Sequence, residues 1–176
     1  MNVRQMTLDE QPPQEENVSH KGMVTLAEAR EYVDNGREEG VFCPCCKRFV
    51  KTYKRKLNSG MGVTLIRIYK HSLTWIHVID FLREHNFHDS RDWTRLKHWG
   101  FLEESGDTPE NGTKKSGLWK ITPKGILFVT AQISCSKYIV LSEDELVNYD
   151  GEQISIIDAL GSHFNYTELM NEIINL

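Results

Sequence analysis

The sequence predicts an α+β fold in which a set of helices is followed by a two-stranded β-hairpin. From residue 61 to residue 99, apolar side chains recur three and four positions apart, which is the spacing of a buried helix face. After residue 100 the apolar runs shorten to strand length around a strong turn signal, Asn111-Gly112. With 39% hydrophobic and 10% aromatic residues, the chain can form a packed core, which excludes a disordered or collagen-like protein.

A tail and a short helix are expected before this core. Pro12-Pro13 and a Gln/Glu-rich tract indicate that residues 1–22 form a flexible tail. A helix should begin at Thr25, because Thr25 and Glu28 have the spacing of a capping box, and it should end near Asn35-Gly36. The tail lacks the apolar stretch of a secretory signal, and no run reaches the ~20 apolar residues of a membrane span. We therefore expect a cytoplasmic protein with no membrane partner.

Three helices and a hairpin account for the centre of the chain. The helices are expected at residues 61–71, 74–85 and 89–99. The third should have Asp89 or Ser90 as its N-cap and should end at Gly100. Its inward-facing residues should be Trp93, Leu96 and Trp99. The strands of the hairpin are expected at residues 101–104 and 117–121, on either side of a loop at 105–116. A further helix should start at Thr122-Pro123, because proline is tolerated in a first helical turn.

The C-terminal residues are expected to form a small appendage of strands and a helix. Strand-like runs lie at residues 137–141, 145–149 and 153–156. The turn signal Asp150-Gly151 lies among them, and Asn165 and Glu168 have capping-box spacing before a final helix of about ten residues. The chain thus divides into a tail, an N-terminal helix with a cysteine turn, a central domain and the appendage, at residues 1–22, 23–60, 61–133 and 134–176.

The junction between the second hairpin strand and the next helix resembles that of a known family. Its sequence, from Gly117 to Gly125, is GLWKITPKG. In MarR-like and PadR-like regulators an aliphatic residue, Thr, Pro or Asp, a small or basic residue and Gly close the wing in the same way. The run from Leu96 to Glu103 (LKHWGFLE) matches their usual passage from a helix through glycine into the wing. Residues 74–131, about a third of the chain, therefore resemble a winged helix-turn-helix domain.

This resemblance implies a winged-helix core, made of three helices plus a two-stranded wing, and DNA binding as its usual role. Winged helices also dock proteins, so the resemblance implies the fold more strongly than the partner. The overall layout, with a CPxC knuckle in front of the domain, also resembles small proteins of phages and mobile elements.

Charge is segregated along the chain, although the formal net charge is only −4. Residues 41–124 hold 16 Lys/Arg and 8 Asp/Glu, whereas the net charge is −5 over residues 1–40 and −7 over residues 125–176. A polyanion would therefore be attracted to the basic centre. We expect the acidic C-terminus to stay off a duplex and to contact another protein or a second copy of the chain. The alternative is that solvated faces merely differ in sign.

The third helix and two basic segments carry the candidate DNA-binding residues. On the helix face opposite the tryptophans, or at its edge, lie Arg91, Thr94, Arg95, Lys97 and His98. In a major groove such a face offers arginine to guanine and threonine to a base edge or a phosphate. The candidates for phosphate contacts are Lys51, Lys54 and Arg55 after the cysteines, and Lys114 and Lys115 in the wing. The alternative is a solvated helix face that needs no partner.

Three of the four cysteines form a cluster, Cys43-Pro44-Cys45-Cys46. Two thiolates three positions apart form a knuckle, which is half of a tetrahedral structural zinc site. No second CxxC occurs, and the histidine pair at ligand spacing that could complete the site is His85 and His88. Cys45 could replace either cysteine as a ligand. The alternatives are a turn with buried thiols and no metal, or a redox CxxC, which the lack of a βαβ pattern disfavours.

The sequence offers no recognisable catalytic motif, so an enzyme is not expected. It contains no P-loop, no GxGxxG and no GxSxG. We expect a double-stranded DNA-binding protein, a transcriptional regulator or phage-type accessory factor, that uses the helix at 90–99 and the wing at 105–116. The alternative is a phage-type protein-interaction module that inhibits or redirects a partner protein. On that view the wing and Trp99 dock on the partner, and the acidic ends imitate the charge of DNA.

Overall fold

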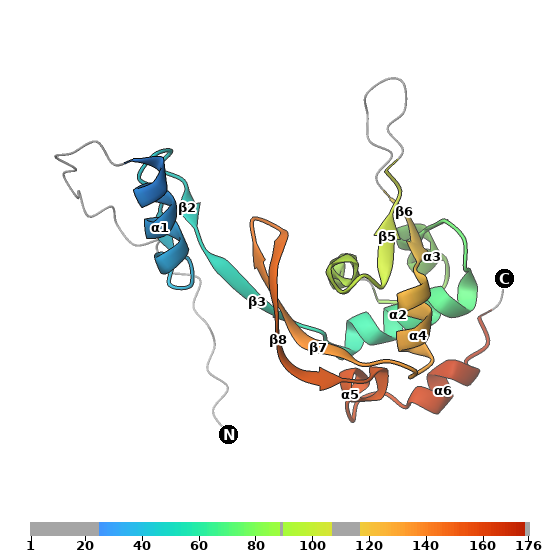
Figure 1. Cartoon of the computed structure of the whole chain (residues 1–176). Helices are drawn as coiled ribbons and strands as arrows, with labels where there is room; N and C mark the ends of the chain where they lie inside the picture. Colours follow the sequence, from blue (N-terminus) through green and yellow to red (C-terminus); the bar gives the residue numbers. More distant parts are fainter. Residues whose placement is uncertain (1–24, 89, 107–116, 175–176) are drawn as a thin grey trace, which may run out of the picture.

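The computed structural model describes residues 25–88, 90–106 and 117–174, and it confirms the α+β class (Figure 1). The N-terminal elements are α1 (Leu26–Gly36), β1 (Val41–Phe42), β2 (Phe49–Val50) and β3 (Thr52–Lys56). The central elements are α2 (Ser59–His71), β4 (Ile76–His77), α3 (Val78–Glu84), the 3₁₀ helix η1 (Asp92–Trp99), β5 (Leu102–Glu104), β6 (Leu118–Ile121) and α4 (Pro123–Val129). The C-terminal elements are β7 (Cys135–Ser142), β8 (Glu145–Ile154), α5 (Ile156–Leu160) and α6 (Tyr166–Asn171). The predicted tail, residues 1–22, lies outside the described residues.

α1 and the β1–β2 hairpin project from the rest of the molecule (Figure 1). α1 begins at the predicted capping box, in which the Thr25 hydroxyl accepts a hydrogen bond from the Glu28 N–H and the Glu28 carboxylate accepts one from the Thr25 N–H at 2.8 Å. Ala29 is buried, but Leu26 and Tyr32 are 68% and 53% exposed. Two large apolar side chains of α1 therefore lie at the surface of the described structure.

α2 lies at the centre of the hydrophobic core. Its N-cap is Asn58, whose side-chain oxygen accepts a hydrogen bond from the Met61 N–H at 2.9 Å. Leu65, Ile66 and Ile68 on α2 are fully buried. Because α2 packs against η1, α4, α5 and α6, one continuous core joins the central and the C-terminal elements. Neither α2 nor any other described helix is long and apolar enough to cross a membrane.

β4, β6 and β5 form an antiparallel sheet with β6 in the middle. Leu102 pairs with Ile121 on one side of β6, and Ile76 pairs with Trp119 on the other. The two strands that were predicted to flank the loop are therefore present and paired. Most of that loop, residues 107–116, lies outside the described residues, and so do Lys114 and Lys115.

The prediction of one helix over residues 74–85 is wrong at its start. Ile76 and His77 form β4, and the helix α3 begins only at Val78. As a strand, these two residues pair with β6 and satisfy its backbone hydrogen-bonding groups on that edge. This pairing depends on β6, which lies more than 40 positions later in the chain, so helical spacing alone does not reveal it.

The third predicted helix is present as a 3₁₀ helix that begins later than expected. Its N-cap is Arg91, which has a left-handed backbone with φ of 56°. Ser90 precedes the N-cap position, although its hydroxyl accepts a hydrogen bond from the Asp92 N–H at 3.4 Å, and residue 89 lies outside the described residues. The three inward-facing residues, Trp93, Leu96 and Trp99, are buried as predicted. Gly100 ends the helix with φ of 73°. The indole N–H of Trp99 donates a hydrogen bond to the Ser136 carbonyl at 2.8 Å, so a docking role for this buried side chain is wrong.

β3, β7 and β8 form a second antiparallel sheet, which joins the segment before α2 to the segment after α4. Lys54 on β3 pairs with Val140 on β7, and Arg55 pairs with Ile139. The basic segment after the cysteines and the C-terminal segment therefore share one sheet. The C-terminal residues are integrated with the central core through α5 and α6, which pack on α2.

The turns of the C-terminal segment differ from the predicted ones. β7 and β8 are joined at Glu143-Asp144, where both residues have positive φ, as the type I′ two-residue hairpin loop requires. Gly151 instead lies within β8, with φ of 82°, next to a register shift opposite β7. The expected strand at 153–156 ends at Ile154, and a capping box at Ser155 begins α5 there. Asn165 caps the final helix as predicted, but α6 has only six residues.

Candidate functional site

The exposed side of η1 carries the residues that were expected to approach DNA bases. Arg91 and Lys97 are exposed, and Thr94, Arg95 and His98 are half-buried. The Thr94 hydroxyl donates a hydrogen bond to the Arg91 carbonyl at 2.9 Å, which ties it to the backbone at the start of the helix. The side chain of Arg95 forms an ion pair with Asp92 one turn earlier. These residues lie along one element, and the helix leaves part of each side chain accessible.

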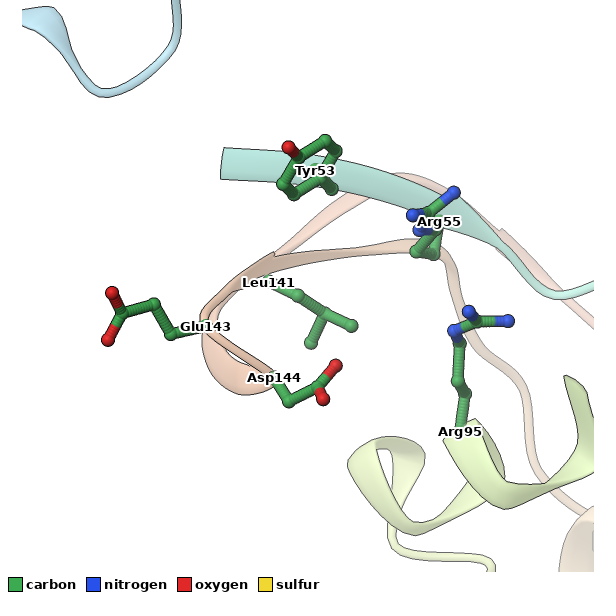
Figure 2. Close-up of a pocket in the computed structure, with 6 residues that line it drawn as sticks. All are labelled: Tyr53, Arg55, Arg95, Leu141, Glu143 and Asp144. Atoms are coloured by element: carbon green, nitrogen blue, oxygen red, sulfur yellow. The ribbon is translucent and has the colours of Figure 1, made fainter. Parts of the chain in front are cut away.

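An open groove of ≈ 250 Å³ lies between η1 and the β3–β7–β8 sheet (Figure 2). Its lining residues are Tyr53, Arg55, Arg95, Leu141, Glu143 and Asp144. Arg55 comes from β3 and Arg95 from η1, and Figure 2 shows both guanidinium groups on the same side of the groove. Two candidate residues therefore line the same groove: Arg55, which was predicted to contact phosphate, and Arg95, which was predicted to approach bases.

The acidic turn between β7 and β8 forms the opposite side of this groove (Figure 2). Glu143 and Asp144 lie there, and the Tyr149 hydroxyl on β8 donates a hydrogen bond to the His98 carbonyl at 2.7 Å. The acidic turn of the C-terminal segment therefore lies beside η1, and that the acidic C-terminus stays off a duplex remains a prediction. Sequence reasoning missed these contacts, because they depend on the long-range packing of β7 and β8 against η1, for which no local signal exists.

His98 lies close to several charges at the end of η1. Burial, and next the charge of Lys97, lower the pKa of His98, whereas the charge of Asp144 acts in the opposite direction. A lowered pKa means that this imidazole is neutral at neutral pH. His98 therefore offers hydrogen-bonding nitrogens to a partner, and the positive charge of this face comes from the arginines and Lys97.

The three candidate phosphate-holding residues on or before β3 have different surroundings. Lys54 forms an ion pair with Asp150 on β8, and its ammonium lies 4.4 Å from the centre of the Tyr138 ring. Hydrogen bonding to Lys54, and next to the Gly151 N–H, lowers the pKa of the Asp150 carboxyl. Arg55 is exposed and its guanidinium lies 5.4 Å from the centre of the Tyr53 ring. Lys51 is half-buried. Of the three, Arg55 is thus placed at the groove.

The cysteine cluster forms a tight turn between β1 and β2. The Cys43 N–H donates to the Arg48 carbonyl at 2.7 Å, and the Lys47 N–H donates to the Cys43 carbonyl at 2.9 Å. Lys47 has a left-handed backbone with φ of 61°. Hydrogen bonds from the backbone of Cys46, and next from that of Cys45, lower the pKa of the Cys43 thiol. Cys45 and Cys46 are exposed and Cys43 is half-buried, so the cluster is not a set of buried thiols.

The structure does not bring the candidate histidine ligands to this turn. His85 follows the last residue of α3 and packs among Phe81, Phe87 and His71 in tilted or edge-on contacts, with ring centres 5.0, 5.5 and 5.8 Å away. α3 and the β1–β2 hairpin lie on opposite sides of the molecule (Figure 1). Within residues 25–88, 90–106 and 117–174, no group of three or more His, Cys, Asp or Glu residues is arranged to hold a metal ion. His88 is exposed just beyond α3.

Comparison with known proteins adds no assignment to this geometry. No protein-family model, no curated protein and no solved structure matches the chain. The function therefore has to be inferred from the residues of the chain itself.

Proposed function

We propose that the protein binds double-stranded DNA through a winged-helix domain formed by α2, α3, η1, α4 and the β4–β6–β5 sheet. The order of these elements and the central place of β6 support this proposal, because the two strands of a wing and a short strand after the first helix pair in this way. In this arrangement η1 is the element that approaches the major groove, with Arg91 and Lys97 exposed on it.

The observation that carries the proposal is the shared groove of Arg55 and Arg95. A DNA backbone that follows this groove would meet one cation from β3 and another from η1, so both elements would contact the same duplex. An accessible guanidinium group is suited to bidentate hydrogen bonds with phosphate oxygens. The Arg95 side chain keeps 35% of its surface exposed while it is paired with Asp92, so it is available for such a contact.

Binding of the whole chain to a random-sequence duplex, measured by fluorescence anisotropy over a salt series, tests the proposal. The logarithm of the association constant should fall linearly with the logarithm of the salt concentration, by about 0.9 for each phosphate contact. A second duplex of the same length but of a different random sequence should show the same slope, since phosphate contacts do not depend on sequence. No binding at low salt, or binding without a salt response, would overturn the proposal.

The second candidate function is protein docking, and the exposed strand β8 favours it. Leu146, Val147 and Tyr149 on β8 are 37%, 46% and 42% exposed, close to the acidic Glu143-Asp144 turn. A partner of this kind would recognise an apolar surface beside negative charge. Replacing Leu146 and Val147 with threonine would weaken such a complex, and DNA binding would not change.

A further inference from the structure

The Cys43–Cys46 turn places two cysteines three positions apart in one tight loop between β1 and β2. The Cys43 N–H donates to the Arg48 carbonyl at 2.7 Å and the Lys47 N–H donates to the Cys43 carbonyl at 2.9 Å, so both candidate ligands lie within one closed turn. The left-handed Lys47 turns the chain back into β2, directly after the second candidate ligand, Cys46. Soft thiolate ligands three positions apart select zinc among the common divalent ions.

The described chain supplies only half of the four ligands that a structural zinc site needs. No third and fourth ligand lie beside the turn within the part of the chain that the structure covers, and His85 lies across the molecule. The turn itself is accessible, with Cys45 and Cys46 exposed at the end of a hairpin that projects away from the core (Figure 1). A ligand pair from outside the chain can therefore reach it without moving the core.

We propose that one zinc ion joins two copies of this chain, with Cys43 and Cys46 of each copy as its four ligands. Each thiol loses its proton as its sulfur binds zinc, so four protons are released and nothing is oxidised or reduced. The four thiolates leave a net negative charge on the centre. Lys47 and Arg48 of both copies, which are exposed directly after the ligands, offset that charge. The inference does not depend on DNA binding.

A second feature of the same projecting unit suits contact between two copies. α1 lies beside the β1–β2 hairpin in Figure 1 and exposes Leu26 and Tyr32. Apolar helix residues usually face a partner, and the described chain buries Ala29 of α1 but leaves Leu26 and Tyr32 exposed. When the two cysteine turns share one zinc ion, the two α1 helices are brought near each other, and their apolar side chains gain a surface on which to pack.

The test combines metal content with oligomeric state, measured on the untagged full chain purified under reducing conditions. Elemental analysis should give one zinc for every two chains, and native mass spectrometry should give a dimer that carries a single zinc ion. A strong chelator should convert the dimer to monomers, and added zinc should restore it. Cobalt in place of zinc should give the charge-transfer and visible bands of a site with four sulfur ligands.

Matched variants separate the proposed ligands from their neighbours. Cys43→Ser and Cys46→Ser should each abolish both the zinc and the dimer. Cys45→Ser, in the same turn, and the double variant His85→Ala with His88→Ala should keep both. Circular dichroism shows whether a variant without zinc is still folded, and the cobalt spectrum of the unchanged chain tests the ligand set independently of any variant.

Several results would overturn the inference. One zinc ion on each monomer would mean that a single chain completes the site. Loss of zinc in the double histidine variant would identify a different ligand set. A zinc content near zero after growth in zinc-supplemented medium would remove the site altogether, and a dimer that persists after zinc is removed would show that the metal does not join the copies.

Discussion

Arg55 on β3 and Arg95 on η1 line the same groove, although forty positions separate them in the sequence. β3 reaches this position because it pairs with β7 along its whole length, and β7 packs against η1. The Trp99 indole, hydrogen-bonded to the Ser136 carbonyl at the start of β7, fixes η1 to the same sheet. The two guanidinium groups are thus held by rigid elements, which favours a contact with a regular backbone such as that of DNA.

Replacing either groove arginine should weaken DNA binding by removing a phosphate contact. Arg55→Ala and Arg95→Ala should each reduce the salt slope by about 0.9, and the double variant by about twice that. Arg83→Ala is the matched control, because Arg83 is an exposed arginine on α3 that pairs with Asp80. Fluorescence anisotropy over a salt series measures these four variants and the unchanged protein. Equal slopes for Arg83→Ala and the double variant would show that the groove does not contact DNA.

Removing the negative charge of the β7–β8 turn should strengthen DNA binding. Glu143 and Asp144 lie across the groove from the two arginines and repel a phosphate there. Asn suits both positions, because it tolerates the positive φ of this turn. The variant Glu143→Asn with Asp144→Asn should bind a duplex severalfold more tightly at low salt, and the gain should shrink as salt screens the charges over about 10 Å.

The control for that variant removes the same charge from another surface. Glu38→Gln with Glu39→Gln changes two exposed carboxylates just after α1. It should alter binding far less than the turn variant. If the turn variant binds DNA more weakly and the control does not, the acidic turn supports the DNA contact and does not repel the phosphates.

The sequence predicted the elements that depend on local signals and missed those that depend on distant pairing. The capping box at Thr25, the N-cap at Thr122 and the buried face of Trp93, Leu96 and Trp99 are all confirmed, because neighbouring residues determine them. The strand at Ile76 was missed, since it exists only through its pairing with β6.

The candidate site shows the same division. The exposed residues of η1 follow from helical spacing, but the groove requires β3, η1 and the β7–β8 turn to meet in space. Asp150-Gly151 illustrates the difficulty: it has the composition of a hairpin turn, and yet the turn forms at Glu143-Asp144. The pairing of β8 with β7, with Glu145 opposite Ser142, places the turn there, and a local turn signal carries no information about that pairing.

Gly125 in the junction after β6 should not tolerate a side chain. A Cβ atom there would lie 2.3 Å from the Phe101 carbonyl oxygen and 2.9 Å from the Ile121 side chain. Gly125→Ala should therefore destabilise the protein by about 1–3 kcal/mol, the usual cost of overpacking a core. Gly60→Ala is the matched control, because Gly60 is exposed in the first turn of α2 and its Cβ would meet only the Asn58 side chain at 3.4 Å.

Urea unfolding compares the two glycine variants with the unchanged protein. Gly60→Ala should be neutral or should stabilise by up to about 1 kcal/mol, because alanine is the better helix former. A Gly125→Ala variant as stable as Gly60→Ala would show that α4 does not approach Phe101 this closely.

His71 should make the fold less stable as the pH falls below neutral. Burial, and next the charge of His85, lower the pKa of His71, while the charge of Glu84 acts in the opposite direction. The Nδ1 atom of His71 is buried without a hydrogen-bond partner in the described residues. Because the unfolded chain then binds a proton more readily than the folded one, stability is lost below the unfolded pKa of about 6.5. His71→Asn should lose less stability than the unchanged protein between neutral pH and about pH 5, when urea unfolding is measured at both. The exposed His163→Asn should match the unchanged protein, and an equal loss in all three would rule out His71 as the source.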